Sequence, residues 1–415
     1  MSPSETFCVL PWLHVNLWPS GDVHHCCLAE KDNAMGQLST ATPDQIVNNK
    51  KYKDLRLKML KGEKPFSCMR CFEREDHNIV SMRQHHNDFF QDRIDSVLSK
   101  TQPDGHVDDF KFEYWDFRFS NLCNMKCRMC GSHFSSQWYD EEVELVRRGN
   151  LNSKSYPVAS HRLMNAQDTS SFDIIEWIDS KIDDVKYIYF AGGEPLIMDE
   201  HYYILQKLIE KDRRDVKIKY NTNLLKLRFK QHDLLDMWSN FNDIQVSASI
   251  DDIDARAEYI RKGTVWKDIE NNLQQLNTTN VKLHIECTTQ ILNVLNLPKL
   301  FERLQTIGIP SYSIMLHNVL QSPEHYTVKV LSDELKQQVK NQFEDCLNTL
   351  EHKERAILEP KLKNILDYMY DMNNFDRQEQ QRRFKKRTQQ MDNLRQENFN
   401  KVFPELEEWY NGISL

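Results

Sequence analysis

From residue 112 onward, short apolar runs alternate with longer stretches in which apolar residues recur at helical spacing. The apolar runs predict six strands, at residues 112–119, 186–191, 215–220, 243–250, 281–288 and 311–316. The stretches between them predict helices, among them 199–211, 230–239, 264–277 and 296–307. This alternation predicts an α/β fold in which right-handed crossovers join the strands of a parallel sheet.

The regions on either side of this part have a different pattern. The N-terminal region is rich in cysteine, histidine and tryptophan, and it includes a predicted helix at 43–62 that ends at Gly62. A polar connector follows it, and a highly charged helical extension ends the chain. We therefore expect four segments, 1–75, 76–111, 112–325 and 326–415.

Composition narrows the class of protein. The chain has 415 residues, 40% of them hydrophobic, and a net charge of -8, which argues against a general nucleic-acid-binding surface. The polar run 376–387 is basic in part, and it could touch nucleic acid, but we predict a solvated helix face. We find no apolar stretch of about 18 residues and no secretory signal, so we expect a cytoplasmic protein without a membrane partner.

Cysteines are the most informative residues, and eight of the ten precede residue 131. In a reducing compartment, clustered cysteines indicate metal binding or catalysis more often than disulfides. Cys123, Cys127 and Cys130 have the spacing C-x3-C-x2-C directly after the first predicted strand. Three thiolates can hold three irons of a [4Fe–4S] cluster and leave the fourth iron open to a small molecule. The alternative is a zinc site, for which His133 is an available fourth ligand.

The second predicted strand ends in Gly192, Gly193 and Glu194, although the chain has only 11 glycines. Together with the three cysteines, this motif resembles the radical S-adenosylmethionine (SAM) superfamily. The resemblance implies a partial (β/α)6 barrel, a [4Fe–4S] cluster and bound SAM. It also implies that Gly192, Gly193 and Glu194 lie along the methionine end of SAM. The competing interpretation is an ordinary strand-to-helix turn, with Pro195 at the helix start.

The same resemblance assigns residues at the later strands. Ser249 and Arg261 become candidates for binding the SAM carboxylate, and Asn223 ends the third strand close to the expected site. Asp251 bonds the ribose or caps the next helix, and these alternatives stay open. The family often has an aromatic residue near the adenine at the position before the third cysteine. Here it is Met129, whose polarizable thioether could fill the same role.

Four further cysteines, Cys8, Cys26, Cys68 and Cys71, form a second set in the N-terminal region. Their pattern resembles the twitch domain, a shortened relative of the SPASM domain, here placed before the barrel. The resemblance implies one auxiliary [4Fe–4S] cluster with four protein ligands, suited to electron transfer. A structural zinc site is the alternative, and Cys27 could replace Cys26 as a ligand.

The resemblance implies an enzyme that cleaves SAM to a 5′-deoxyadenosyl radical, which abstracts a hydrogen atom from a substrate. A one-electron donor of flavodoxin or ferredoxin type would reduce the cluster. The substrate is a peptide or protein side chain or, as the alternative, a small molecule such as a sugar or aminocyclitol that is dehydrogenated. A third hypothesis is a zinc-binding interaction protein without enzymatic activity. The residue that completes the reaction is not identifiable from the sequence.

Overall fold

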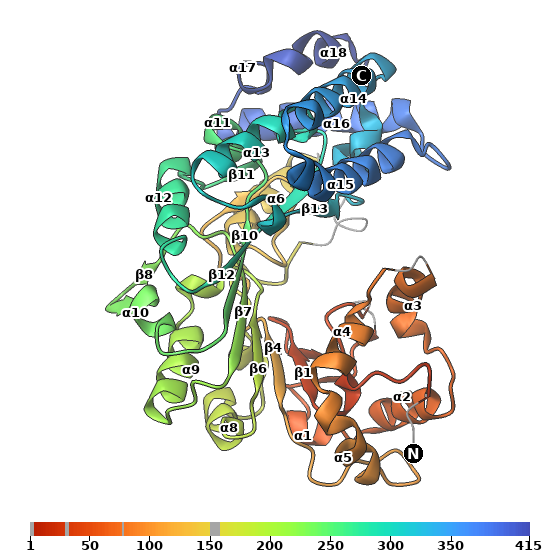
Figure 1. Cartoon of the computed structure of the whole chain (residues 1–415), viewed down its shortest axis with the longest axis vertical. Coiled ribbons are helices and arrows are strands. Elements are labelled where there is room, and N and C mark those ends of the chain that lie inside the picture. The colour runs from red at the N-terminus through yellow and green to blue at the C-terminus, as the bar shows by residue number, and fades with distance from the viewer. Residues whose placement is uncertain (1–3, 30–32, 77–78, 150–157) are drawn as a thin grey trace. The chain divides into compact units, whose positions relative to one another are not determined.

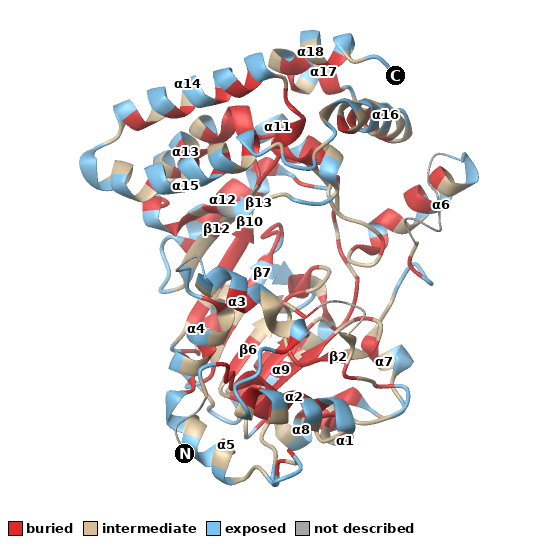
Figure 2. Cartoon of the chain, turned by 90° about the vertical axis from the view of Figure 1, so that its right-hand side faces the viewer, coloured by how far each residue is buried: buried red, intermediate tan, exposed pale blue. Residues whose placement is uncertain are grey.

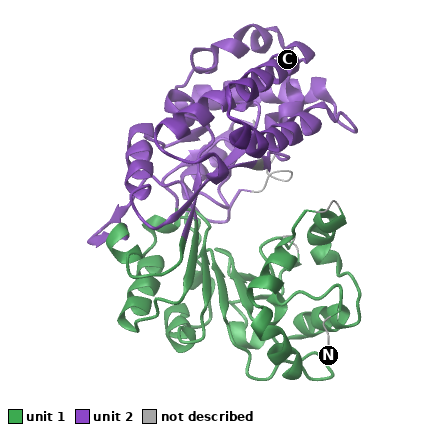
Figure 3. Cartoon of the chain, in the orientation of Figure 1, with its two compact units in different colours: residues 1–122, 163–220, 235–244 green, residues 123–162, 221–234, 245–415 purple. Residues whose placement is uncertain are grey.

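The computed structural model describes residues 4–29, 33–76, 79–149 and 158–415 (Figure 1). Two compact units make up the chain, and we describe each by itself (Figure 3). The first unit contains residues 1–122, 163–220 and 235–244, and the second contains 123–162, 221–234 and 245–415. None of the helices in the described ranges is long and apolar enough to cross a membrane.

The first unit is built on a sheet whose strand order is β7-β6-β4-β1-β2-β3. The bounds are β1 His14–Leu17, β2 Asp22–His24, β3 Gly36–Gln37, β4 Tyr114–Phe117, β6 Tyr187–Phe190 and β7 Lys217–Thr222. Strands β4, β6 and β7 are parallel, β1 adds to β4 in parallel, and β2 and β3 continue antiparallel. The N-terminal cysteine-rich region therefore extends the same sheet, a pairing that its short apolar runs did not predict.

The two faces of this sheet differ in polarity, because paired residues of neighbouring strands share a face. One face carries the apolar rows Val15, Trp115, Ile188, Ile218 and Leu17, Phe117, Phe190, Tyr220. Trp177 of α8 packs on this face against Trp115 and Phe117. The other face carries the polar rows His14, Tyr114, Tyr187, Lys217 and Asn16, Asp116, Tyr189, Lys219.

The helices of the first unit flank this sheet, with α8 and α9 beside β6 and β7 in Figure 1. They are α1 Pro43–Ile46, α2 Lys50–Leu60, α3 Met69–Asp76, α4 Met82–Phe89, α5 Ile94–Ser99, α7 Ala166–Thr169, α8 Ile174–Lys181, α9 Asp199–Glu210 and α10 Leu234–Trp238. Each of α1 and α4 begins with a capping box, formed by Thr42 and Gln45 in α1 and by Ser81 and Gln84 in α4.

The second unit contains the parallel strands β10 Ile244–Ser249, β12 Lys282–Thr289 and β13 Ile314–Val319. Two short ribbons accompany them, β5 Lys126–Cys127 with β11 Arg261–Lys262, and β8 Arg228–Phe229 with β9 His232–Asp233. Its helices are α6 Tyr139–Arg147, α11 Asp254–Ile260, α12 Trp266–Leu276, α13 Leu297–Thr306, α14 Asp333–Thr349, α15 His352–Tyr370, α16 Arg377–Arg395, α17 Phe399–Val402 and α18 Glu407–Gly412. Helix α15 packs against β13, and Figure 2 shows buried residues along one side of α14.

The structure confirms the predicted α/β class, all six strands and the helical C-terminal region. It corrects the helix predicted at 43–62, which is interrupted between Ile46 and Lys50 because Asn49 caps a new helix, α2. The connector 76–111 contains α4 and α5, and the helix predicted at 230–239 is reduced to α10. The boundaries of the four predicted segments stay a prediction.

Candidate functional site

The three-cysteine loop in the second unit is held by backbone pairing. Cys127 lies in β5, where it pairs with Arg261 of β11, and the amide of Cys130 donates to the carbonyl of Cys127 at 3.0 Å. The indole Nε1 of the buried Trp138 donates to the same carbonyl at 2.8 Å. The strand end, the ribbon and the indole together fix the path of the loop between Cys127 and Cys130.

Three predicted SAM-site residues lie at this loop. Arg261 donates from Nε to Asp251 Oδ2 at 2.8 Å, and its Nη1 lies 3.7 Å from Cys127 Sγ. Asn223 donates from Nδ2 to Asn124 Oδ1 at 2.7 Å. The second unit therefore brings Asn223, Asp251 and Arg261 to the cysteine loop.

Asp251 is fully occupied by protein partners. Its Oδ2 accepts from Arg261, and its Oδ1 accepts from the amide of Thr288 at 2.9 Å. The N-cap of α11 is Ile253, without a side-chain cap, so the prediction that Asp251 caps the next helix is wrong. The physical reason is that the buried carboxylate already has two donors, one of them a guanidinium.

Gly263 lets the segment after β11 approach the loop closely. It has φ +105°, and a Cβ built on it would lie 2.6 Å from the carbonyl oxygen of Asn124. Only glycine adopts this backbone conformation at little cost, and no side chain fits against that carbonyl. The sequence did not predict this contact.

We expect Gly263→Ala to lower the free energy of unfolding by at least about 2 kcal/mol, because it adds backbone strain and displaces the Asn124 carbonyl. Urea unfolding of the cluster-free protein measures this. Gly62→Ala is the matched control, since Gly62 also has positive φ, +78°, but nothing lies within 4 Å of its Cβ position. Equal losses in both variants would show that the contact with Asn124 contributes nothing.

Arg128, between the second and third cysteines, anchors the loop to the C-terminal helices. Its side chain is buried, and Nη2 lies 2.7 Å from both Asp392 Oδ1 and Glu397 Oε2. The guanidinium lies over the ring of Tyr259, 3.6 Å from its centroid. Residues of the charged C-terminal extension thus hold the cysteine loop, a role that its polar sequence did not suggest.

The surroundings of the loop sulfurs suit a cluster. The amide of Met125 donates to Cys123 Sγ at 3.4 Å, and Arg261 faces Cys127 Sγ. Hydrogen bonds and positive charge at the sulfurs stabilise a thiolate-bound cluster and tune its potential. Burial, followed by the nearby Cys127, raises the pKa of Cys130 to about 12, so these thiols need bound metal to ionise. The donor set therefore fits an iron–sulfur group.

Gly192, Gly193 and Glu194 lie in the first unit, at the end of β6. A Cβ on Gly193 would lie 2.1 Å from the carbonyl oxygen of Leu122, the residue directly before Cys123. Glu194 is buried and caps a short 3-10 helix, Pro195–Ile197, by accepting from Leu196. The strand-to-helix turn is thus real, and the glycines there pack against the strand end that leads into the cysteine loop. Binding of SAM by these three residues stays a proposal.

The N-terminal cysteines Cys8, Cys26, Cys68 and Cys71 line one cavity of the first unit. Cys68 ends a short 3-10 helix, Phe66–Cys68, and Cys71 lies in α3, three residues on and therefore on the same face. Cys27 does not line the cavity; its Sγ lies 3.4 Å from Met82 Sδ. The predicted set of four is therefore brought together with Cys26 rather than Cys27.

Three basic side chains border this cavity, those of His25, Arg70 and Arg83. His25 Nε2 lies 3.7 Å from Cys68 Sγ, and burial lowers the pKa of His25 to about 4. Arg83 pairs with Glu75 and donates from Nη1 to the carbonyl of Phe7 at 2.8 Å. Burial raises the pKa of Cys68 to about 11. Four cysteines that line one cavity with two arginines fit a group that carries negative charge once the thiols ionise.

No group of three or more His, Cys, Asp or Glu side chains in the described ranges forms a ready site for a single metal ion. The two cysteine sets are therefore identified as candidate cluster sites by their position, on one loop and around one cavity, and by the chemistry of their thiols. Ser249 ends β10, paired with Glu286, and Met129 is half-buried on the loop. Among the described residues, no side-chain hydrogen bond joins Ser249 or Met129 to the cysteines of the loop.

The polar face of the first unit is a candidate substrate surface that the sequence did not indicate. Asp116 is completely buried beside Arg118, at 3.5 Å, and its Oδ2 has no hydrogen-bond partner among the described residues. Burial raises the pKa of Asp116. Tyr220 lies on the opposite, apolar face, where its hydroxyl bonds His201 and Trp238. Side chains alternate between the two faces along a strand, so the sequence could have shown which residues of each strand share a face.

Comparison with known families decides the class of protein. Residues 117–299 match the model of the radical SAM superfamily, and residues 8–72 match SPASM, an iron–sulfur cluster-binding domain. Residues 117–299 form a domain of the radical SAM superfamily. These matches confirm the predicted cofactors, [4Fe–4S] clusters and SAM, and they support an enzyme. They also argue against the zinc-binding interaction protein.

Similar solved structures are distant. Two are structures of anSMEcpe, one with bound AdoMet and the Cp18Cys peptide (17% identity, 55% of this chain and 57% of that chain, TM-score 0.32) and one with bound AdoMet (16%, 55% and 59%, 0.33). A third is TYW1 with a lysine-pyruvate adduct bound (15%, 60% and 70%, 0.28). This chain thus covers little more than half of the length of anSMEcpe. Among curated proteins, the sequence comparison finds no match.

Proposed function

We propose that this protein is a two-cluster radical SAM enzyme. Cys123, Cys127 and Cys130 hold the cluster with the open iron, and Cys8, Cys26, Cys68 and Cys71 hold an auxiliary cluster. When bound, the first cluster supplies one-electron cleavage of SAM to methionine and a 5′-deoxyadenosyl radical. The observation that carries this proposal is that three cysteines lie on one loop while four others line a separate cavity.

The residues of the chain position these groups. Asn223 and the Asp251–Arg261 pair border the cysteine loop, where they would orient SAM or tune the cluster. Arg261 keeps Nη1 towards Cys127 while Nε is held by Asp251, so the guanidinium is fixed before a ligand arrives. Ser249 and Met129 are further candidates to bind SAM in the second unit, and Gly192, Gly193 and Glu194 are the candidates in the first.

The proposed substrate is a peptide or protein side chain, and the reaction removes hydrogen or forms a new bond with the auxiliary cluster as electron acceptor. The polar face around Asp116 and Arg118 would meet the substrate. Oxidation of a sugar or aminocyclitol is the alternative, and no contact within the described residues favours it. Deuterated candidate substrates distinguish the two: deuterium should enter 5′-deoxyadenosine from a labelled peptide, and transfer only from a labelled small alcohol would reject the peptide.

For the auxiliary cluster, we expect Cys68→Ala/Cys71→Ala to lower iron from about eight to about four per chain, because each site holds four irons. SAM cleavage should persist, uncoupled from product formation. Iron analysis and 5′-deoxyadenosine release after anaerobic reconstitution measure both. Cys27→Ala is the matched control, because Cys27 is the neighbouring cysteine that does not line the cavity. Unchanged iron in the double variant would contradict an auxiliary cluster at these residues.

A further inference from the structure

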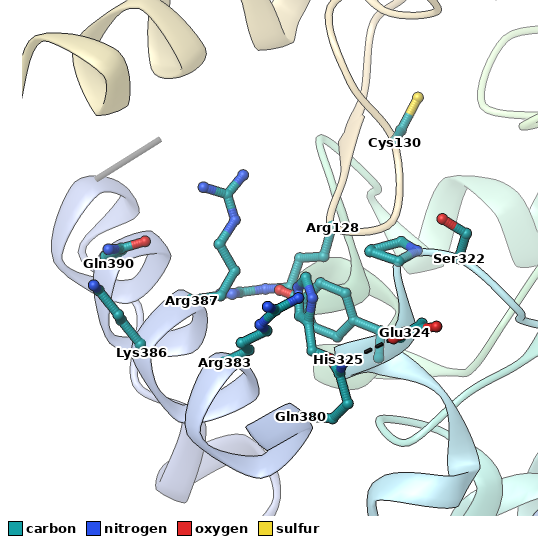
Figure 4. A pocket seen from close by; sticks show the side chains of 12 residues that line it. Arg128, Cys130, Ser322, Glu324, His325, Gln380, Arg383, Lys386, Arg387 and Gln390 are labelled. Atoms are coloured by element: carbon teal, nitrogen blue, oxygen red, sulfur yellow. Dashed lines mark hydrogen bonds between the residues drawn. The ribbon is translucent and has the colours of Figure 1, made fainter. Parts of the chain in front are cut away.

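A second pocket lies in the second unit beside the cysteine loop, and it is basic. It has a volume of about 530 Å³, within the range that holds a small molecule. Three segments line it: the loop with Arg128 and Cys130, residues 322–326 after β13, and helix α16 (Figure 4). The helix contributes Gln380, Arg383, Lys386, Arg387 and Gln390.

Positive charge in this pocket is only partly paired with carboxylates of the protein. Within the described residues, Lys386 and Arg387 form no ion pair. Arg383 pairs through Nε with Glu379 at 2.8 Å. The lining carboxylate of Glu324 accepts from Gln380 at 2.8 Å, the bond drawn in Figure 4. Two uncompensated cations around one hollow favour a bound anion.

Unused hydrogen-bond donors point to the same conclusion. Arg128 Nη1, His325 Nε2, Tyr326 Oη and Arg387 Nη1 are buried without a partner among the described residues. Tyr326 and Arg128 are only 1% and 2% exposed. Burial, then Arg387 and Arg383, lower the pKa of His325 to about 3, so its ring is neutral and able to donate one hydrogen. Buried donors without partners are costly, and a ligand oxyanion would satisfy them once their shielded side chains turn toward the pocket.

We propose that this pocket binds the phosphate group of a small molecule. A phosphate offers several acceptor oxygens and about two negative charges, which match two arginines, a lysine and the unused donors. The site lies beside Cys130, so a phosphorylated ligand there would be held next to the loop of the SAM cluster. This inference does not depend on the proposed reaction, because it concerns binding alone.

The test is binding of inorganic phosphate to the reconstituted full-length protein, measured by calorimetry at constant ionic strength, with acetate and sulfate in parallel arms. We expect saturable phosphate binding, weakened about tenfold or more by Arg387→Gln and by Arg383→Gln. Arg382→Gln is the matched control: Arg382 lies on the same helix, is 47% exposed and does not line the pocket. It should bind phosphate as the wild type does.

Several results would overturn the proposal. They are absence of phosphate binding by the wild type, an equal loss in Arg382→Gln, or equal binding of acetate. Displacement of phosphate by SAM would make the pocket part of the SAM site instead. If phosphate does not bind but Arg387→Gln slows reduction by an acidic flavodoxin, the basic surface is a protein-docking site and the phosphate proposal fails. Circular dichroism of each variant excludes misfolding as the cause.

Discussion

Cys127→Ala is expected to abolish release of 5′-deoxyadenosine from SAM under dithionite, down to the level without protein. Cys127 is the central cysteine of the loop, held by the β5–β11 ribbon, and its Sγ faces Arg261. Without it, the loop retains two thiolates, too few to hold a four-iron cluster with one open iron. Iron should fall by about four per chain, while the auxiliary cluster remains.

Cys346→Ala is the matched control, because Cys346 is a half-buried cysteine of α14 outside both cysteine sets. It should keep full iron content and activity. Chromatographic assay of 5′-deoxyadenosine and iron analysis on the same preparations give both readouts. If Cys127→Ala released 5′-deoxyadenosine at the wild-type rate, the assignment of the loop as the SAM cluster site would be wrong.

Arg128→Met is expected to have the largest effect on stability, a loss of about 3–5 kcal/mol in the free energy of unfolding. The substitution leaves Asp392, 14% exposed, without its cation, and Glu397, 11% exposed, with Lys262 alone, 3.0 Å away. It also removes the bond from Nε to the carbonyl of Tyr259, at 3.2 Å. Urea unfolding of the cluster-free protein measures the change, and iron retention reports the looser loop.

Arg147→Met is the control, since Arg147 pairs with Glu144 on α6 but is 71% exposed, and it should cost less than about 1 kcal/mol. Adding Asp392→Asn to Arg128→Met should recover part of the loss, because the unpaired carboxylate is then absent. A loss below about 1 kcal/mol in Arg128→Met would mean that the buried ion pair does not hold the loop.

Much of the fold and the cysteine sets could be predicted from the sequence, because they depend on local signals. Apolar runs mark buried strands, and C-x3-C-x2-C is short enough to be read within one loop. The pairing of β1 with β4 joins residues 100 apart in the chain, such as Asn16 and Asp116, and nothing local in the run His14–Leu17 indicates it. Long-range pairing depends on the whole sheet.

Side-chain roles were harder to predict for the same reason. In the sequence, Arg128 is only a polar residue between two cysteines of the motif. Its partners Asp392 and Glu397 lie in the C-terminal region, far away along the chain. The role predicted for Asp251 as a cap failed because Arg261 and the Thr288 amide occupy its oxygens. Run 376–387 was predicted to be solvated, and Arg382, Arg383 and Lys386 are exposed as expected. The sequence did not indicate that Arg383, Lys386 and Arg387 also line a pocket.

The most direct test of the central claim, that the three-cysteine loop holds a cluster whose open iron binds SAM, is electron paramagnetic resonance of the Cys68→Ala/Cys71→Ala protein. In this variant the loop cluster is the one expected to remain. After reduction with dithionite, addition of SAM should change the g values of the cluster signal, because SAM becomes a ligand of the open iron. A cluster signal that is the same with and without SAM would contradict the account.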